Sequence, residues 1–566
     1  MPRQIALVLF LSPLAVITTR LATRSHYLFS WDAVQFALAM DDLDLAKHQP
    51  HPPGYVLFVL AGKMLRPLVG DAATALVTWN VLAASLSLIL VFLFAYHAED
   101  ENRLERGWLA WFLLLPSALF WFYGSTTGIY MSELLFTLLV AYFCFRAIQG
   151  ESAFLPWAAI ALAICGGFKL SAMVLLMPLC FYTLFCCARR GHRTRFVLIY
   201  LLTLSAWFLP FVLTQGIREY FDLFYQQVGD VGRQTSPIVS TFVSSILRNT
   251  RDVGYSLALG VGLSNLIVVI SLLLWRRRLT LLRGRHLTFL ALWTGPFLAV
   301  FLLLHIGNPG YTLPLVPSGI ILLAIIFTRD LGPRARAIVT VVSLMTASAH
   351  FLVAAQLSPS SVGRGLTFGE KSWEQRILSQ VNLLFFPTYS TIRTADADLE
   401  SVRDEIRSVC PDSSDVVIVV EDDRLNWRKI QYYLPETVAV RPREVGRNSF
   451  MLANHRAVVV DSGPALEVEE TCRTFWILPE ESPWLISLRE TGAVNATELP
   501  LRNLFWTQGK ARAFVDDGSE IRIVSDQMLG PVPRSSTLTA VLLGSKLSQE
   551  ALRLPEIEPS DQTRRE

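Results

Sequence analysis

The sequence predicts a polytopic α-helical membrane protein of about eleven transmembrane helices, followed by a C-terminal soluble α/β domain. Of its 566 residues, 52% are hydrophobic and only 17% are charged, whereas ordinary soluble proteins have about 25% charged residues. The mean hydropathy is +0.41. Residues 1–356 also contain repeated apolar runs of about 17 to 25 residues, the length that crosses the hydrocarbon core of a bilayer.

The predicted membrane-spanning module covers residues 1–356. Its first apolar run has no A-x-A-type cleavage site before Arg20, so we expect a retained helix and not a removed signal peptide. Each predicted crossing is an apolar run bounded by polar or charged residues. The eleven runs are 5–21, 73–96, 108–122, 132–146, 154–168, 170–188, 196–214, 255–275, 287–304, 312–328 and 337–356.

The apolar segment 55–68 decides the topology. It has about 14 residues and is interrupted by Lys63 and Arg66, so it is either a short crossing or a helix at the membrane surface. If it does not cross, the arginine clusters of the later loops fall on the same side as Arg3, as the positive-inside rule requires. We therefore expect a surface helix, a cytoplasmic N-terminus and a C-terminal domain outside.

The tail changes character after residue 356. Short β-rich runs (416–420, 438–440, 457–460, 474–478 and 521–524) alternate with helical patterns at 399–409 and 424–433. This alternation predicts an α/β domain over 357–545 with a largely parallel sheet. Residues 546–566, rich in Glu, Arg, Pro and Ser, are expected to be disordered. Cys410 and Cys472 could pair, but sequence spacing does not decide it.

The loop 22–72 contains an unusual stretch, SWDAVQFALAMDDLDLAKHQPHPPGY, at residues 30–55. So many ionisable residues beside lipid are costly unless they are solvated or functional. Asp32 begins an expected short helix at 31–40, where its carboxylate could act as a general base or as a ligand for Mg²⁺ or Mn²⁺. Alternatively, it only favours the helix start, with Ser30 as the cap.

Further polar residues follow in the same loop. Asp41, Asp42 and Asp44 form a D-D-x-D cluster, which suits either a divalent cation or the solvated end of a helix. We take Asp42 and Asp44, together with Asp32, as candidate metal ligands. The remaining candidates are His48, His51 and Tyr55, which either contact substrate or support the loop by hydrogen bonds.

The expected topology brings several other polar residues to the external face that holds this loop. Lys169, between two apolar helices, is costly without an anionic partner, unless it snorkels to the surface. Segment 215–254 is expected to be a long external loop that could close over substrate. Glu133, at a helix start, could contact substrate. The candidates for binding a donor phosphate are Lys169, Arg218, His305 and Tyr311.

The motif HQPHPPGY after an acidic turn resembles the first external loop of the C-type glycosyltransferases. These include protein O-mannosyltransferases and lipid A aminoarabinose transferases. GSTTGIYMSELLF, GGFKLSAMVLLMP and HIGNPGYTLPLVP are similar to later loops of that superfamily, in the same order. The resemblance implies a polyprenyl-phosphate-linked sugar donor and a bacterial inner membrane location with a periplasmic C-terminal domain. Asp32 matches the acidic residue that activates the acceptor or helps to hold a metal, and Ala33 stands where O-mannosyltransferases have a second acid.

The favoured hypothesis is an inverting glycosyltransferase that acts on a glycan, lipid or protein acceptor. A lipid or sugar transporter or flippase is an alternative, but most ionisable residues lie at helix ends and no internal repeat is evident. A third hypothesis is a non-catalytic envelope assembly protein that acts through its external domain. No Lys/Arg stripe with interleaved aromatic residues indicates a nucleic-acid partner.

Overall fold

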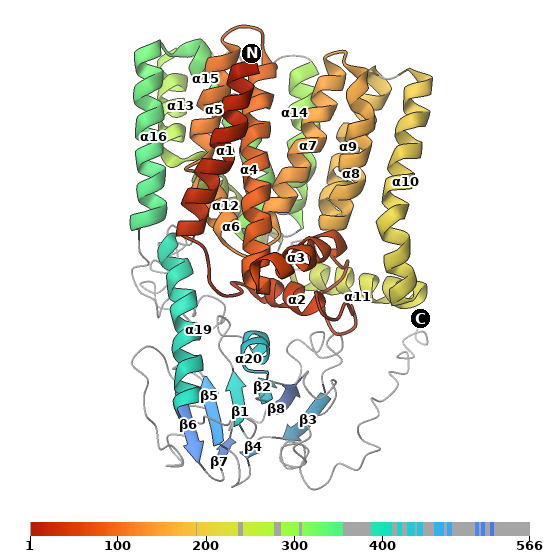
Figure 1. The fold of residues 1–566 in the computed structure, drawn as a ribbon, viewed down its shortest axis with the longest axis vertical. Coiled ribbons are helices and arrows are strands. Elements are labelled where there is room, and N and C mark those ends of the chain that lie inside the picture. Colours follow the sequence, from red (N-terminus) through yellow and green to blue (C-terminus); the bar gives the residue numbers. More distant parts are fainter. Residues whose placement is uncertain are drawn as a thin grey trace. The chain divides into compact units, whose positions relative to one another are not determined.

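A computed structural model describes residues 2–187, 189–235, 242–276, 285–304, 308–354 and 387–409, with shorter segments between 416 and 525 (Figure 1). The chain forms two compact units. One consists of Met1–Leu45 with Gln49–Asp396, and the other of Ala46–His48 with Ala397–Glu566.

The described part of the first unit is almost entirely helical. Long helices run side by side, and α2, α3 and α11 lie across one end of them, opposite the N-terminus of the chain (Figure 1). The elements are α1 (Pro2–Ala22), α2 (Trp31–Ala39), α3 (Val56–Val69), α4 (Ala72–Ala98), α5 (Arg103–Leu114), α6 (Ala118–Ser125), α7 (Tyr130–Ile148), η1 (Ser152–Phe154), α8 (Leu155–Phe168), α9 (Leu170–Cys187), α10 (Arg190–Gln215), α11 (Ile217–Thr235), α12 (Phe242–Val261), α13 (Leu263–Arg276), α14 (Arg285–Leu303), η2 (Pro309–Leu315), α15 (Val316–Asp330), α16 (Pro333–Val353) and the start of α19 (Tyr389–Val409).

Seven helical segments in the described residues are long and apolar enough to cross a membrane, and two bent pairs raise the number to nine. The bent pairs are α5 with α6, at 62°, and α12 with α13, at 94°. The two remaining runs of the predicted eleven form shorter apolar helices, Ser152–Phe168 and Leu170–Cys186. The chain is therefore an integral membrane protein, and its predicted helical membrane architecture is confirmed.

The first loop contains two short helices. Helix α2 begins after Ser30, whose side-chain oxygen accepts a hydrogen bond from the Ala33 N–H at 3.2 Å. Helix α3 has 14 residues, which gives a length of about 21 Å, too short for a hydrocarbon core of about 30 Å. It ends at Gly70, whose φ of +98° suits a residue without a Cβ. Segment 55–68 accordingly is absent from the candidate spans among the described residues.

Segment 215–254 differs from the sequence prediction, because most of it is helical and not a loop. Gly216, with a φ of +83°, separates α10 from α11. The exposed apolar residues of α11 recur at the spacing of one helical face. The polar residues between them lower the mean hydropathy of the segment, so hydropathy alone did not indicate a helix. The exposed apolar residues are Ile217, Phe221, Tyr225 and Val228.

The described strands of the second unit form a six-stranded mixed sheet in the order β3-β8-β2-β1-β5-β6, and a separate β4-β7 pair. The strands are β1 (Val416–Val420), β2 (Val438–Glu444), β3 (Val458–Gly463), β4 (Ala465–Val468), β5 (Arg473–Ile477), β6 (Leu504–Gln508), β7 (Ala511–Phe514) and β8 (Ile521–Ser525), with helix α20 (Trp427–Tyr433) between β1 and β2.

Only two of the described strand pairs in this sheet are parallel, and both include β1. β1 pairs in parallel with β2 and β5, whereas the pairs β2–β8, β3–β8 and β5–β6 are antiparallel. The expectation of a largely parallel sheet was therefore wrong for the described strands. Sequence alternation located β1, β2, β3, β5 and β8 but gave no pairing direction. Cys410, Cys472 and residues 546–566 lie outside the described residues, and the domain boundary at 356 remains a prediction.

Helix α4 is fixed at its start to the turn that leads into α7. Asn80 is fully buried, and its Nδ2 donates hydrogen bonds to the carbonyls of Thr126 and Gly128, both at 2.7 Å. In a hydrocarbon environment these two carbonyls have no water to replace a lost donor. Asn80 therefore holds the turn before α7 against α4.

Replacing Asn80 by Leu is expected to lower the free energy of unfolding by about 1–3 kcal/mol for each carbonyl left without a donor. Thermal unfolding of the purified protein in detergent measures the effect. Thr78→Leu, at a half-buried position on the same helix, is the control and should change stability much less. Equal stability of the two variants would contradict this account of the turn.

Candidate functional site

A buried ion pair joins the start of α7 to the junction of α8 and α9. The Nζ of Lys169 lies 2.5 Å from Oε2 of Glu133, and their side chains are 8% and 2% exposed. Lys169 has extended backbone between the two helices, and Glu133 lies in the first turn of α7. Two charges removed from water in this way are stable only together, because each would otherwise lack a counter-ion.

Two tyrosine rings flank the ammonium group of this pair. The Nζ of Lys169 lies 4.3 Å from the ring centre of Tyr311 and 5.1 Å from that of Tyr130. The aromatic faces attract the cation electrostatically. Lys169 is thus held between one carboxylate and two aromatic rings.

Asn308 holds Tyr123, Tyr130 and the turn that carries Tyr311. Its Oδ1 accepts hydrogen bonds from the hydroxyl of Tyr123 at 3.1 Å and from the N–H of Gly310 at 2.9 Å, and its Nδ2 donates to the hydroxyl of Tyr130 at 2.5 Å. A Cβ on Gly310 would lie only 2.7 Å from ring atoms of Tyr123 and Tyr130. The absence of a side chain at 310 is what lets η2 approach α6 and α7.

Gly166 and Gly167, which lie shortly before Lys169 in the chain, allow other elements to approach the end of α8. A Cβ on Gly167 would lie 2.5 Å from the side chain of Leu57 in α3, and one on Gly166 would lie 2.5 Å from Sδ of Met173 in α9. Substitution at either position therefore requires a neighbour to move. The pair of glycines brings the HPPG-linked helix α3 against the end of α8.

His51 is held by three groups from the first loop. Oε1 of the buried Gln35 accepts a hydrogen bond from the backbone N–H of His51 at 3.3 Å and lies 2.7 Å from its Nδ1. Since Oε1 is an acceptor, Nδ1 carries the proton and Nε2 accepts from the hydroxyl of Tyr55 at 3.2 Å. Asp32 Oδ1 lies 3.9 Å from Nδ1, so the imidazole is oriented with a carboxylate beside it.

Burial shifts the pKa values of His51 and Tyr55 in this loop. Burial lowers the pKa of His51; the nearby Asp32 opposes this change, whereas Lys169 adds to it. Burial also raises the pKa of Tyr55 well above its usual value, with further contributions from Tyr311, Asp32 and Glu133. His51 is therefore kept neutral and Tyr55 protonated near neutral pH, which preserves the hydrogen bond between them.

The first loop and the buried ion pair belong to one electrostatic cluster. Asp32 and Lys169 both lie near enough to His51 to act on its pKa, which Asp32 raises and Lys169 lowers. The side chain of Asp32 is 45% exposed, in contrast to Glu133. The cluster thus contains the half-exposed carboxylate of Asp32 and the buried ammonium group of Lys169.

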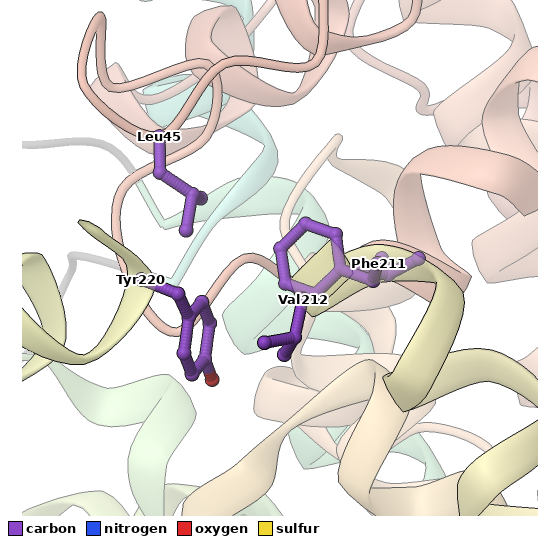
Figure 2. Packing of buried hydrophobic residues seen from close by; sticks show 5 residues of the cluster. Leu45, Phe211, Val212 and Tyr220 are labelled. Atoms are coloured by element: carbon purple, nitrogen blue, oxygen red, sulfur yellow. The ribbon is translucent and has the colours of Figure 1, made fainter. Parts of the chain in front are cut away.

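A corner between α10 and α11 holds the acidic loop in place. Gln215 Oε1 accepts from the Leu45 N–H at 3.0 Å, and its Nε2 donates to the Leu43 carbonyl at 2.9 Å. Leu45 also belongs to an apolar cluster with Val56, Phe211, Val212 and Tyr220, and four of these five are labelled in Figure 2. These contacts restrain the chain just before the HPPG turn.

The structure brings six of the predicted residues into the electrostatic cluster. They are Asp32, His51, Tyr55, Glu133, Lys169 and Tyr311. Arg218 instead lies on α11 with a side chain that is 96% exposed, 3.7 Å from Asp222. His48 belongs to the other compact unit, and His305 lies outside the described residues.

The acidic turn has structural contacts of its own. Asp41 forms a salt bridge of 2.7 Å with Arg66 of α3, and the backbone of Asp44 pairs with that of Gln49. Across the described residues, no three His, Cys, Asp or Glu side chains gather in a group that could hold a metal ion. A metal held by Asp32, Asp42 and Asp44 therefore stays a prediction.

Sequence reasoning missed several residues that build the cluster. Asn308 was detectable in principle, because Asn before Pro and Gly is typical of a helix start. Tyr130 lies in the motif GSTTGIYMSELLF, of which only Glu133 was predicted to be a site residue. Gln35 and Gln215 gave no signal, since a single amide among apolar residues does not show which backbone group it contacts.

The fold is similar to that of ArnT, a lipid A aminoarabinose transferase. The crystal structure of ArnT from Cupriavidus metallidurans bound to undecaprenyl phosphate matches with a TM-score of 0.53 at 12% identity, over 92% of this chain and 97% of that chain. The apo structure of the same protein matches with a TM-score of 0.51 at 12% identity, over 91% and 96%. No family model and no curated protein sequence matches the chain. The similarity confirms the predicted C-type glycosyltransferase-like fold of the membrane module.

Lys169→Met alone is expected to lower the free energy of unfolding by about 3–5 kcal/mol, because it leaves Glu133 buried without a counter-ion. The double variant Lys169→Met/Glu133→Leu removes both charges and should recover most of this loss. Denaturation of the purified protein in mixed micelles measures both. Glu151→Gln, which removes a half-exposed partner of Arg146, serves as the control with an effect under about 1 kcal/mol. A single variant as stable as the native chain would disprove the coupling.

His51 should make stability depend on pH. Its pKa is lower in the folded chain, so the unfolded chain binds more protons below about pH 6.5 and the free energy of unfolding rises with pH in that range. The stability that neutral His51 contributes is thus lost as the pH falls. Melting temperatures between pH 5 and 7.5 should show a shallower slope for His51→Gln than for the native chain. An unchanged slope in His51→Gln would refute the assignment.

Proposed function

We propose that the chain is a glycosyltransferase that moves a sugar from a polyprenyl-phosphate donor to a glycan, lipid or protein acceptor. The reaction takes place at the external face of a bacterial inner membrane, with the N-terminus in the cytoplasm. One observation carries the proposal: the half-exposed carboxylate of Asp32 lies in one electrostatic cluster with the buried cation of Lys169. The likeness in fold to ArnT, whose structure holds undecaprenyl phosphate, supports it.

Asp32 is the proposed base. Its exposure lets an acceptor hydroxyl or amine approach from solvent, and an ionised carboxylate can take the proton as the acceptor attacks the anomeric carbon. The bond between that carbon and the phosphate oxygen breaks on the opposite side. The polyprenyl phosphate leaves with the electron pair, and the configuration at the anomeric carbon is inverted.

Lys169 and its neighbours are proposed to stabilise the departing phosphate. The ammonium group has three N–H donors, of which one is directed at Glu133. Tyr311, whose ring lies over the ammonium group, carries a hydroxyl that could add a further donor. Donors fixed in a poorly solvated place stabilise developing negative charge more effectively than water does, because they need not reorient during the reaction.

The other polar residues have supporting roles in this proposal. Glu133 holds Lys169 in place, and His51 orients Tyr55 while accepting its proton in a hydrogen bond. Mg²⁺ or Mn²⁺ at Asp32, Asp42 and Asp44 remains a sequence-based expectation, and no step above depends on it. Arg218, His48 and His305 remain candidate substrate contacts.

Asp32→Asn is expected to reduce sugar transfer by about 10²–10⁴-fold, the usual contribution of a general base. The assay uses the purified protein in liposomes with radiolabelled sugars on polyprenyl phosphate and an envelope extract as acceptor. The variant should fold normally, because Asp32 is half-exposed. Asp222→Asn, on the exposed face of α11, should retain full transfer. Full activity of Asp32→Asn would refute the role of Asp32, and passage of labelled donor across liposomes without any acceptor would favour the transporter alternative.

A further inference from the structure

Gln35 and Asp32 approach the same nitrogen of one imidazole ring. Both residues lie on α2, three positions apart, which places them on one face of the helix. Nδ1 of His51 lies 2.7 Å from Oε1 of Gln35 and 3.9 Å from Oδ1 of Asp32. The N–H group at Nδ1 therefore has two acceptors nearby, and it is bonded to the closer one.

Gln35 is a fixed acceptor for this N–H group. Its side chain is 1% exposed, and its Oε1 also accepts a hydrogen bond from the backbone N–H of His51 at 3.3 Å. Because a backbone N–H only donates, the atom that it contacts is the amide oxygen and not the amide nitrogen. The same oxygen requires the imidazole proton to be on Nδ1. Nε2 is left as an acceptor for the hydroxyl of Tyr55 at 3.2 Å.

Asp32 is the other acceptor within reach of Nδ1. Its side chain is 45% exposed and therefore less restrained than the buried amide, so a small rotation would bring it to Nδ1 if the amide were absent. A hydrogen bond to an ionised carboxylate favours the ionised form. A carboxylate stabilised in this way takes up a proton less readily, which weakens it as a general base.

Apolar contacts also join α2 to the residues after the HPPG turn. Phe36, next to Gln35, is 1% exposed and packs edge-on against Tyr55 at 5.3 Å and against Phe58 of α3 at 4.9 Å. Aromatic pairs of this geometry stabilise packing beyond the area that they bury. We therefore expect α2 to keep its place when Gln35 is replaced by a buried side chain of similar size, such as leucine.

We infer that Gln35 is a positioning residue for the proposed glycosyl transfer: it holds the N–H group of His51 and so leaves the carboxylate of Asp32 to the acceptor. The inference rests on the proposed function, because it concerns the same carboxylate. Gln35 touches no reacting atom in this scheme and acts through the imidazole. A neutral amide suits the role, since a carboxylate at position 35 would place a second negative charge on the face of α2 that holds Asp32.

The test compares sugar transfer in liposomes by the native chain, Gln35→Leu, His51→Phe and the double variant Gln35→Leu/His51→Phe, per amount of folded protein. Gln35→Leu should lower kcat by about 10- to 100-fold, the usual effect of one hydrogen bond to a charged group. KM for the polyprenyl-phosphate donor should change by less than about twofold, because Gln35 is not proposed to bind the donor. In the His51→Phe background, Gln35→Leu should change kcat by less than about threefold, since no imidazole is left to turn towards Asp32.

Gln215→Leu is the matched control. Gln215 also holds the first loop through its side-chain amide, but it contacts the backbone of Leu43 and Leu45. Its replacement should therefore change kcat by the same factor with and without His51. An equal cost of Gln35→Leu in both backgrounds would overturn the inference, because Gln35 would then act independently of the imidazole. Full activity of Gln35→Leu in the native background would overturn it as well.

A second measurement does not depend on transfer. The ¹⁵N NMR spectrum of protein labelled at its histidines shows which ring nitrogen carries the proton, and the signals of His51 are those missing from His51→Phe. The native chain should have the proton on Nδ1. A neutral ring with the proton on Nε2 would overturn the inference, even where Asp32→Asn abolishes transfer. Full transfer by Asp32→Asn would instead refute the proposed function, so the two failures are distinguished by different variants.

Discussion

The buried pair between Lys169 and Glu133 is the constraint on which the rest of the site depends. Neither charge is stable alone in the membrane, so the start of α7 and the α8–α9 junction must stay in register at 2.5 Å. The glycines before Lys169 and Gly310 in η2 follow from the same requirement, because bulkier residues would separate the elements that surround the pair. The aromatic rings then keep the ammonium group in place without further acids.

Much of the fold follows from simple properties of the sequence. Hydrophobic length located the long apolar helices, and the segment after the HPPG turn, expected at the membrane surface, is too short to be among the candidate spans of the described residues. The cost of an unpaired lysine between apolar helices correctly indicated that Lys169 has an anionic partner. The partner itself, Glu133, was identified only as a helix-start acid, because its distance from Lys169 is set by tertiary packing.

The failures have a shared physical cause. α11 was taken for a loop because its apolar residues are spaced around a helix and are diluted by polar neighbours. Asn308 and Gln35 act through hydrogen bonds to groups remote in sequence or spread over one loop, and composition does not show such contacts. Arg218 was grouped with the phosphate-binding candidates because topology gives only the side of the membrane, whereas its helix turns it towards solvent.

The corner formed by α10 and α11 makes the acidic loop sensitive to bilayer thickness. One face of α11 exposes a row of apolar side chains suited to the acyl boundary, while Tyr220 on the same helix packs with Leu45 of the loop. A helix of this kind follows the level of the lipid headgroups. A thinner or thicker bilayer would therefore shift α11 relative to the long helices, and through Leu45 and Gln215 it would alter the chain that leads to His51.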